Sequence, residues 1–138
     1  MVQSLLPAIV CGLLAMGIGF VWYGPLFGKL WARVVGATEM DAKRRAEMQK
    51  AAGPLYGVQF VLTVWQVWVV SRFLPGTSVA GDLHMSVFLW AGLLVPLIAG
   101  TAMWNNDSAK ISWTRFLLQA GYQLILFIVF ALVFSAWR

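Results

Sequence analysis

The sequence predicts an all-α integral membrane bundle of four transmembrane helices, with a short interfacial helix and a cytoplasmic helix between the first two spans. Hydrophobic residues make up 61% of the chain and charged residues only 11%, whereas soluble domains carry about 25% charged residues. Four apolar stretches reach the length of about 20 residues that a helix needs to cross a bilayer. Most of the basic residues lie between the first two stretches. We interpret residues 1–138 as a single transmembrane domain embedded in the lipid bilayer.

The first predicted span covers residues 3–23 and the second covers residues 54–74. The second stretch follows Gly53, and Pro54 suits the first turn of a helix because no backbone acceptor is available there in any case. The stretch ends before Pro75 and the glycine after it, which do not continue a helix. We therefore expect a helix boundary on each side of the second span.

The third predicted span covers residues 83–104 and the fourth covers residues 113–137. Asp82 is expected to cap the third helix, because a short polar side chain can accept a hydrogen bond from the free N–H groups at a helix start. Asn105 and its neighbour Asn106 follow the end of that span. Ser112 is expected to cap the fourth helix for the same reason as Asp82.

The segment between the first two spans, residues 24–53, begins with a helix break. Trp22 and Tyr23 fall at the expected membrane interface, where aromatic side chains are enriched. Pro25 disfavours helix at the residue before it. Apolar residues then recur with helical spacing up to Gly36, with basic residues on the other face. This pattern predicts a short helix that lies in the membrane surface.

Residues 38–52 predict a separate cytoplasmic helix, which Thr38 is expected to cap. Asp41 precedes Arg45 by four residues, an order that stabilises helices. The charged side chains are interpreted as a solvated face near anionic headgroups. A docking surface for a cytoplasmic partner is the alternative interpretation.

Lys and Arg are distributed unequally between the two sides of the predicted bundle. The segment 24–53 carries six of the ten, and the loop between the last two spans carries two more, counted through Arg115. The opposite side carries only Arg72 and Arg138. The positive-inside rule therefore predicts a cytoplasmic 24–53 segment and both termini outside, in the cell inner (plasma) membrane. Since the basic cluster reads as a topology signal, no nucleic acid is expected as a partner.

The chain lacks the sets of residues that catalysis or metal binding requires. It has one cysteine, Cys11, and one histidine, His84, so a single chain offers neither a disulfide nor a Cys/His metal site. No Asp, Glu, Lys or Arg lies deep inside a predicted span, where ionisable residues mark relays and pumps. No Ser/His/Asp set or nucleotide-binding fingerprint is present. We expect no enzyme activity, no metal and no cofactor.

Small residues on one face of a span allow another helix to approach closely. Two predicted spans carry such a face, and we interpret both faces as helix-packing seams. They are formed by Ala8, Gly12, Ala15 and Gly19 in the first span and by Gly92 and Gly100 in the third. Pro96, between the two glycines of the third span, predicts a kink.

Polar side chains gather on one face of the second span and on one face of the fourth, at matching depths. They are Tyr56, Gln59, Thr63 and Gln66 in the second span and Gln119, Tyr122 and Gln123 in the fourth. One interpretation is hydrogen bonding between helices, which contributes about 0.6 kcal/mol per bond in membranes. The other interpretation is a cavity open to the cytoplasm.

Two segments, GFVWYGPLFGKLW near the first span and LLQAGYQLILFIVFALVFSAW in the last, carry a wider resemblance. They resemble the hallmark stretches of a small bacterial family of integral membrane proteins, the domain-of-unknown-function family seventeen sixty-one. The resemblance covers nearly the whole chain in length and span layout. It implies a four-helix membrane protein of uncharacterised activity, and it supplies no catalytic residue.

If the two segments are the hallmarks of the family, we expect them to face one another and to line one pocket that opens to the cytoplasm. The predicted lining residues are Trp22, Tyr23, Tyr56, Gln59, Thr63, Asn105, Gln119, Tyr122 and Gln123. Such a pocket favours a transporter or channel component for a small neutral or polar solute. A four-span unit is thin for a complete pathway, so a homo-oligomer, with a dimer favoured, is expected. Two alternatives stay open: a structural or assembly subunit that binds another membrane protein, and a lipid- or quinone-handling protein.

Overall fold

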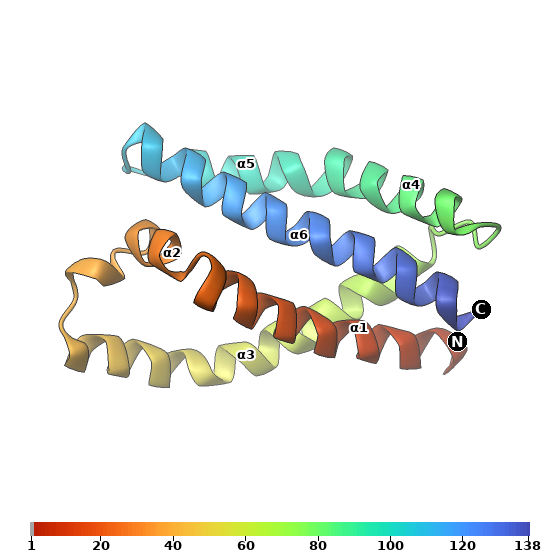
Figure 1. Ribbon diagram of the computed structural model, residues 1–138, viewed down its shortest axis with the longest axis horizontal. Helices are drawn as coiled ribbons and strands as arrows, with labels where there is room; N and C mark the ends of the chain where they lie inside the picture. Colours follow the sequence, from red (N-terminus) through yellow and green to blue (C-terminus); the bar gives the residue numbers. More distant parts are fainter. Residues whose placement is uncertain (1) are drawn as a thin grey trace.

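The computed structural model describes residues 2–138, with side chains from Leu5 onward. All regular structure in this range is helical (Figure 1), which confirms the predicted all-α fold class. The elements are α1 (Val2–Val21), a kinked turn (Trp22–Leu26), α2 (Gly28–Val34), a 3-10 turn (Ala37–Glu39), α3 (Ala42–Ser71), α4 (Val79–Leu89), a π-helical turn (Trp90–Leu94), α5 (Val95–Met103) and α6 (Ala109–Trp137). Four segments are long and apolar enough to cross a membrane: Leu5–Leu26, Ala42–Ser71, Val79–Met103 and Ala109–Trp137.

Helix α6 lies at the centre of the arrangement. It packs against α1 and α2 on one side and against α4 and α5 on the other, while α3 packs mainly against α1. Figure 1 shows both chain termini at one end of the molecule, which we call the terminal end. The opposite end carries α2, the α5–α6 loop and the start of α3, and we call it the α2 end. At the α2 end, α3 and α5 lie on opposite edges of the molecule.

The hydrophobic core lies where α1, α3 and α6 meet in the half nearer the termini. Small residues of α1 allow this meeting, and large side chains of α6 fill the space between the helices. The buried core consists of Ala8, Cys11 and Ala15 from α1, Val67 and Val70 from α3, and Leu126, Phe127, Phe130 and Phe134 from α6.

Glycines of the first span contact neighbouring helices closely, whereas those of the third do not. A Cβ atom on Gly12 would lie only 2.7 Å from Val64 Cγ2, and one on Gly19 would lie 3.0 Å from the Tyr122 hydroxyl. Apart from the adjoining residues and the helix's own backbone, no atom lies within 4 Å of the Cβ position at Gly92 or Gly100. Within one copy, the close glycine-mediated contacts therefore involve α1, whereas the third span packs on α6 without using these two glycines.

The segment between the first two spans contains the predicted short helix, α2, which follows the turn Trp22–Leu26. Gly36 ends this helix in the left-handed conformation (φ 75°), which glycine adopts without steric cost. The predicted cap at Thr38 is wrong, because Thr38 lies in the 3-10 turn and Asp41 caps α3 by accepting a hydrogen bond from the Arg44 N–H at 2.8 Å.

Helix α3 runs without interruption through Pro54, so the predicted boundary at that proline is wrong. The predicted cytoplasmic helix is instead the first part of α3. A proline inside a helix costs about 3 kcal/mol, but a break would leave several N–H and C=O groups of both helix ends without partners. At about 1.5 Å per residue, the 30 residues of α3 span about 45 Å, against about 30 Å of hydrocarbon. About 15 Å of the helix therefore projects beyond the hydrocarbon at the α2 end.

The third span is interrupted in its middle by the π-helical turn Trp90–Leu94, just before Pro96 at the start of α5. Asp82 does not cap this span as predicted, since Ser78 accepts the capping hydrogen bond from the Gly81 N–H at 3.0 Å. Asp82 lies one turn later and is buried. It accepts hydrogen bonds from the Gly76 N–H at 2.9 Å and the Ser135 hydroxyl at 2.6 Å, and it forms an ion pair with Arg138.

The fourth span, α6, begins one turn earlier than predicted. Ser108 caps it, while the predicted cap Ser112 is buried inside the helix. Near this start, the Arg115 guanidinium forms an ion pair with Asp107 at 2.8 Å. It also donates to the Val34 carbonyl at 3.3 Å and to the Ala102 carbonyl at 3.4 Å. Arg115 thereby ties the ends of α2 and α5 to α6.

Candidate functional site

The candidate site is centred on residues 118–123 of α6, where two tryptophans bind the helix backbone. The Trp22 indole N–H donates to the Leu118 carbonyl at 3.0 Å, and the Trp90 indole N–H donates to the Ala120 carbonyl at 3.0 Å. Trp22 begins the kinked turn at the end of α1, where the Gly24 backbone is not helical (φ -106°, ψ -107°). Trp90 begins a π-helical turn, a feature that is frequent at functional sites. A carbonyl oxygen can accept two hydrogen bonds, so these contacts coexist with the α6 helix. Gln119 lies between the two bonded carbonyls in sequence.

Tyr122 joins the same stretch of α6 to α1. Its hydroxyl donates to the Ala15 carbonyl at 2.8 Å, and its ring centroid lies 5.3 Å from that of Tyr23. The adjoining Gly121 leaves room for the Trp22 ring, because a Cβ atom there would lie 3.1 Å from Trp22 Cζ2. The two segments that carry the family resemblance are therefore in direct contact, as expected from the sequence.

Tyr23 also connects the site to α2. Its ring centroid lies 4.6 Å from that of Trp31, and a Cβ atom on Gly28 would lie 3.3 Å from the Tyr23 carbonyl oxygen. The Trp22 ring makes an edge contact with Phe27, with 4.6 Å between the centroids. The spacing of aromatic residues and glycine in this segment thus folds the interfacial helix back against the aromatic residues at the end of α1.

Gln119 and Gln123 lie one turn apart on α6, and both are half-buried. The Gln123 Oε1 atom is fully buried and has no hydrogen-bond donor among the described residues. Leaving a buried acceptor without a donor costs about 1–3 kcal/mol. Gln123 is also close to the midpoint of α6, where a bilayer would supply no water to the amide. The site therefore contains one polar atom for which the fold provides no partner.

The residues predicted to line the pocket from the second span lie apart from this group. Tyr56 is 61% exposed and Gln59 is exposed, while Thr63 is buried. The Gln59 side chain donates to the Thr63 hydroxyl at 3.2 Å, and that hydroxyl donates to the Gln59 carbonyl at 2.8 Å. This polar pair is thus bonded within α3, which packs against the other helices mainly through its second half.

Asn105 is exposed at the α2 end and donates to the Thr101 carbonyl at 2.8 Å. Of the predicted lining residues, Trp22, Tyr23 and Tyr122 are in contact, with Gln119 and Gln123 beside them on α6. Tyr56, Gln59 and Asn105 are not part of this cluster. Residues 2–138 contain no group of three or more His, Cys, Asp or Glu side chains that could hold a metal ion.

Trp90 was not expected to contribute to the site. One signal in the sequence could have indicated this role: Trp90 lies in the middle of the third span and not at a membrane interface. A buried indole N–H usually requires an acceptor, and mid-membrane acceptors come from other helices. Ser86, one turn earlier, follows the same logic, since its hydroxyl donates to the Phe127 carbonyl at 2.7 Å.

The fold and its apolar surface define a multi-pass α-helical membrane protein. Residues 6–135 match the family described as "Protein of unknown function (DUF1761)". The chain belongs to this family, in agreement with the resemblance of its two aromatic segments. No curated protein and no solved structure matches the chain.

Proposed function

We propose that the protein is a component of a membrane transporter or channel for a small neutral or polar solute. The observation that carries the proposal is the buried Gln123 Oε1 atom, which has no donor among the residues described. A hydroxyl or amide group of a solute would supply that donor. Gln119 and Gln123 are uncharged, so they favour a neutral solute, and the proposal includes no catalytic step.

The proposal requires a homo-oligomer, with a dimer as the simplest case. In a single copy, the first half of α3 is largely exposed and lies at the edge of the molecule. The Gln59 amide of the same helix is exposed and falls within the candidate span. A hydrogen bond to a partner helix would stabilise an exposed polar group there. A second copy would cover this edge and give the solute a path between helices of both copies.

We propose that the α2 end faces the cytoplasm and that both termini lie outside. Eight of the ten Lys and Arg belong to the α2 end when the count runs through Arg115, and the positive-inside rule supports this orientation. Thr38→Cys and Thr77→Cys test it, because the chain's single native cysteine, Cys11, is buried. In spheroplasts, a membrane-impermeant maleimide is expected to label Cys at 77 and not at 38. The reverse pattern would overturn the orientation.

The transport proposal is tested in proteoliposomes by stopped-flow light scattering with urea and glycerol as neutral polar probes. Wild-type protein is expected to speed solute entry over protein-free vesicles, and Gln119→Leu combined with Gln123→Leu is expected to remove most of that increase. Gln66→Leu is the matched control, since Gln66 is a half-buried glutamine in another candidate span. An unchanged rate in the double variant, with folding and oligomer state retained, would end the pocket hypothesis.

A second candidate function is that of an assembly subunit for another membrane protein. An exposed face of α3, with large apolar side chains such as Leu55, Val61 and Trp65, favours this candidate. Native mass spectrometry of gently solubilised membranes separates the two. A homo-oligomer with a retained non-lipid molecule supports transport, whereas one copy bound to a stoichiometric membrane protein without a small molecule supports assembly.

A further inference from the structure

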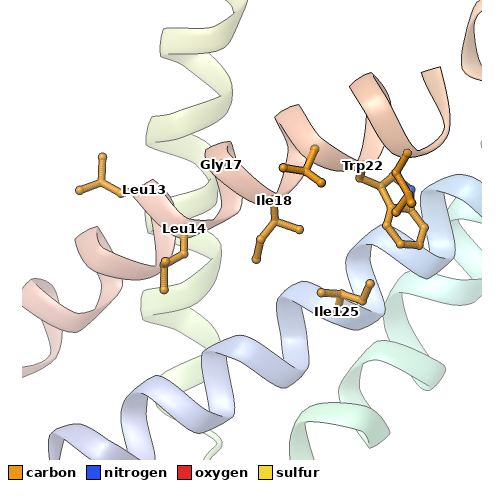
Figure 2. Close-up of a pocket in the computed structure, with 8 residues that line it drawn as sticks. Leu13, Leu14, Gly17, Ile18, Trp22 and Ile125 are labelled. Carbon is orange, nitrogen blue, oxygen red and sulfur yellow. The ribbon is translucent and has the colours of Figure 1, made fainter.

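An apolar groove runs along the face of the molecule between α1 and α6 (Figure 2). Its volume is about 470 Å³. The groove is lined by Leu13, Leu14, Gly17, Ile18, Val21, Trp22, Leu26 and Ile125. Gly17 opens its floor, because no atom apart from the adjoining residues and the helix's own backbone lies within 4 Å of the Cβ position there. Gln119 and Gln123 do not line this groove, which shares Trp22 with the candidate site.

The groove runs lengthwise along the membrane-spanning helix. It extends from Leu13 to Leu26, which at about 1.5 Å per residue is about 20 Å, or about two thirds of the hydrocarbon thickness. Its end at Leu26 coincides with the helix break, and α2 starts two residues later. Lys29 and Arg33 of α2 are both exposed. Two cations therefore follow the mouth of an otherwise apolar groove.

The size of the groove restricts its occupant. A helix about 10 Å across and 20 Å long has a volume of about 1,600 Å³, several times the volume of this groove. Sites for small molecules have volumes of about 300–1,000 Å³. A single hydrocarbon chain fits this range and the apolar lining, whereas a polar solute would find no hydrogen-bond partner on these side chains.

We infer that the groove binds one acyl chain of an anionic phospholipid, whose phosphate is held by Lys29 and Arg33. Basic residues attract anionic headgroups at the membrane surface, and each contributes a factor of about five in affinity. Headgroup and chain are thus recognised by adjacent parts of the same segment. The lipid would fill the space between α1 and α6 next to the Trp22 ring.

The inference is tested by native mass spectrometry of delipidated protein mixed with dioleoyl phosphatidylglycerol or dioleoyl phosphatidylcholine. Wild-type protein is expected to bind one phosphatidylglycerol about thirtyfold more tightly than phosphatidylcholine. Gly17→Leu is expected to remove this tight binding by filling the groove. Gly100→Leu is its matched control, because Gly100 is also a helical glycine with no other residue within 4 Å. Both variants are expected to fold, since leucine is a better helix former than glycine.

The charge contribution is tested separately. Lys29→Gln combined with Arg33→Gln is expected to reduce the preference for phosphatidylglycerol to about that of phosphatidylcholine while one lipid still binds. Lys43→Gln combined with Arg44→Gln, two exposed cations of α3, is expected to change the preference little. The inference is overturned if Gly17→Leu and Gly100→Leu bind lipid equally well, or if Gly17→Leu changes the oligomeric state in place of lipid binding. A much tighter complex with a polyprenyl phosphate would also overturn it, because the ligand would then be another lipid.

Discussion

Replacing Asp82 with asparagine tests how the terminal end of the bundle is held together. Asp82 is 1% exposed and accepts hydrogen bonds from the Gly76 N–H, the Ser135 hydroxyl and the Arg138 guanidinium. These donors belong to the α3–α4 loop and to the last turn of α6. The asparagine side chain keeps one acceptor oxygen, which can still bind the Gly76 N–H. Its amide NH₂ meets the Arg138 guanidinium, which is also a donor, so that contact is lost.

The expected cost follows from the bonds that are lost. A hydrogen bond to a charged group contributes about 1.5–3 kcal/mol. The Arg138 side chain is 39% exposed, and solvent screening lowers the contribution of its ion pair towards about 1 kcal/mol. The Ser135 hydroxyl can rotate and accept from the new amide, which recovers part of its bond. We therefore expect Asp82→Asn to lower the free energy of unfolding by about 2 kcal/mol.

The measurement is equilibrium unfolding by SDS in mixed micelles, followed by tryptophan fluorescence. Asp107→Asn is the control, because Asp107 also pairs with an arginine but its side chain is 37% exposed; its expected loss is at most about 1 kcal/mol. A double-mutant cycle of Asp82→Asn with Arg138→Gln is expected to give a coupling energy of about 1 kcal/mol. The reasoning is refuted if Asp82→Asn unfolds within about 0.5 kcal/mol of wild type, the range of ordinary surface substitutions.

Four other substitutions and one control test the packing and the helix boundaries. Gly12→Ala is expected to lower the free energy of unfolding by about 1–3 kcal/mol in the same SDS titration, because its Cβ would overlap Val64, whereas Gly100→Ala is expected to be neutral or slightly stabilising. Trp22→Phe and Trp90→Phe, which each lose a hydrogen bond to α6, are expected to cost about 0.6–1.7 kcal/mol apiece; no loss in either would mean that the indole bonds add nothing. Pro54→Ala is expected to stabilise α3 by up to about 3 kcal/mol and to slow amide exchange at residues 50–53, and an unchanged exchange rate would indicate a helix boundary there.

The number and order of the spans were predictable from the sequence, but their first residues were not. Each capping error lies about one turn from the true cap: Ser78 caps in place of Asp82, and Ser108 caps in place of Ser112. All four side chains are acceptable caps by local chemistry. The choice is made by tertiary contacts, because Asp82 pairs with Arg138 and Ser112 is buried. Those partners are distant in sequence, so local patterns could not reveal them.

Part of the candidate site was predictable, because some of its contacts join residues that lie at the same depth in two membrane spans. Tyr23 and Tyr122 fall at similar depths in neighbouring spans, and their rings are in contact, with 5.3 Å between the centroids. Gln59 and Gln119 were also predicted to lie at equal depth, but they are not in contact. Equal depth produces contact only where two helices are adjacent along that part of their length. Helix α3 packs mainly against α1, and the order of helices around α6 is a tertiary property. The position of Trp90 depended on that order as well.

The hydrogen-bonding groups of the site separate into those that build the fold and one that does not. Trp22, Trp90 and Tyr122 each donate to a backbone carbonyl of another helix. Their polar groups therefore hold the helices of the bundle together. The Gln123 Oε1 atom has no such partner in the part of the chain that the structure describes. Substitutions at the three aromatic residues should therefore change stability and function together, because they alter the packing of the helices. Gln123→Leu removes the Oε1 atom, which forms no hydrogen bond with the described helices. A change in solute entry without loss of stability would therefore identify that atom as a contact for solute.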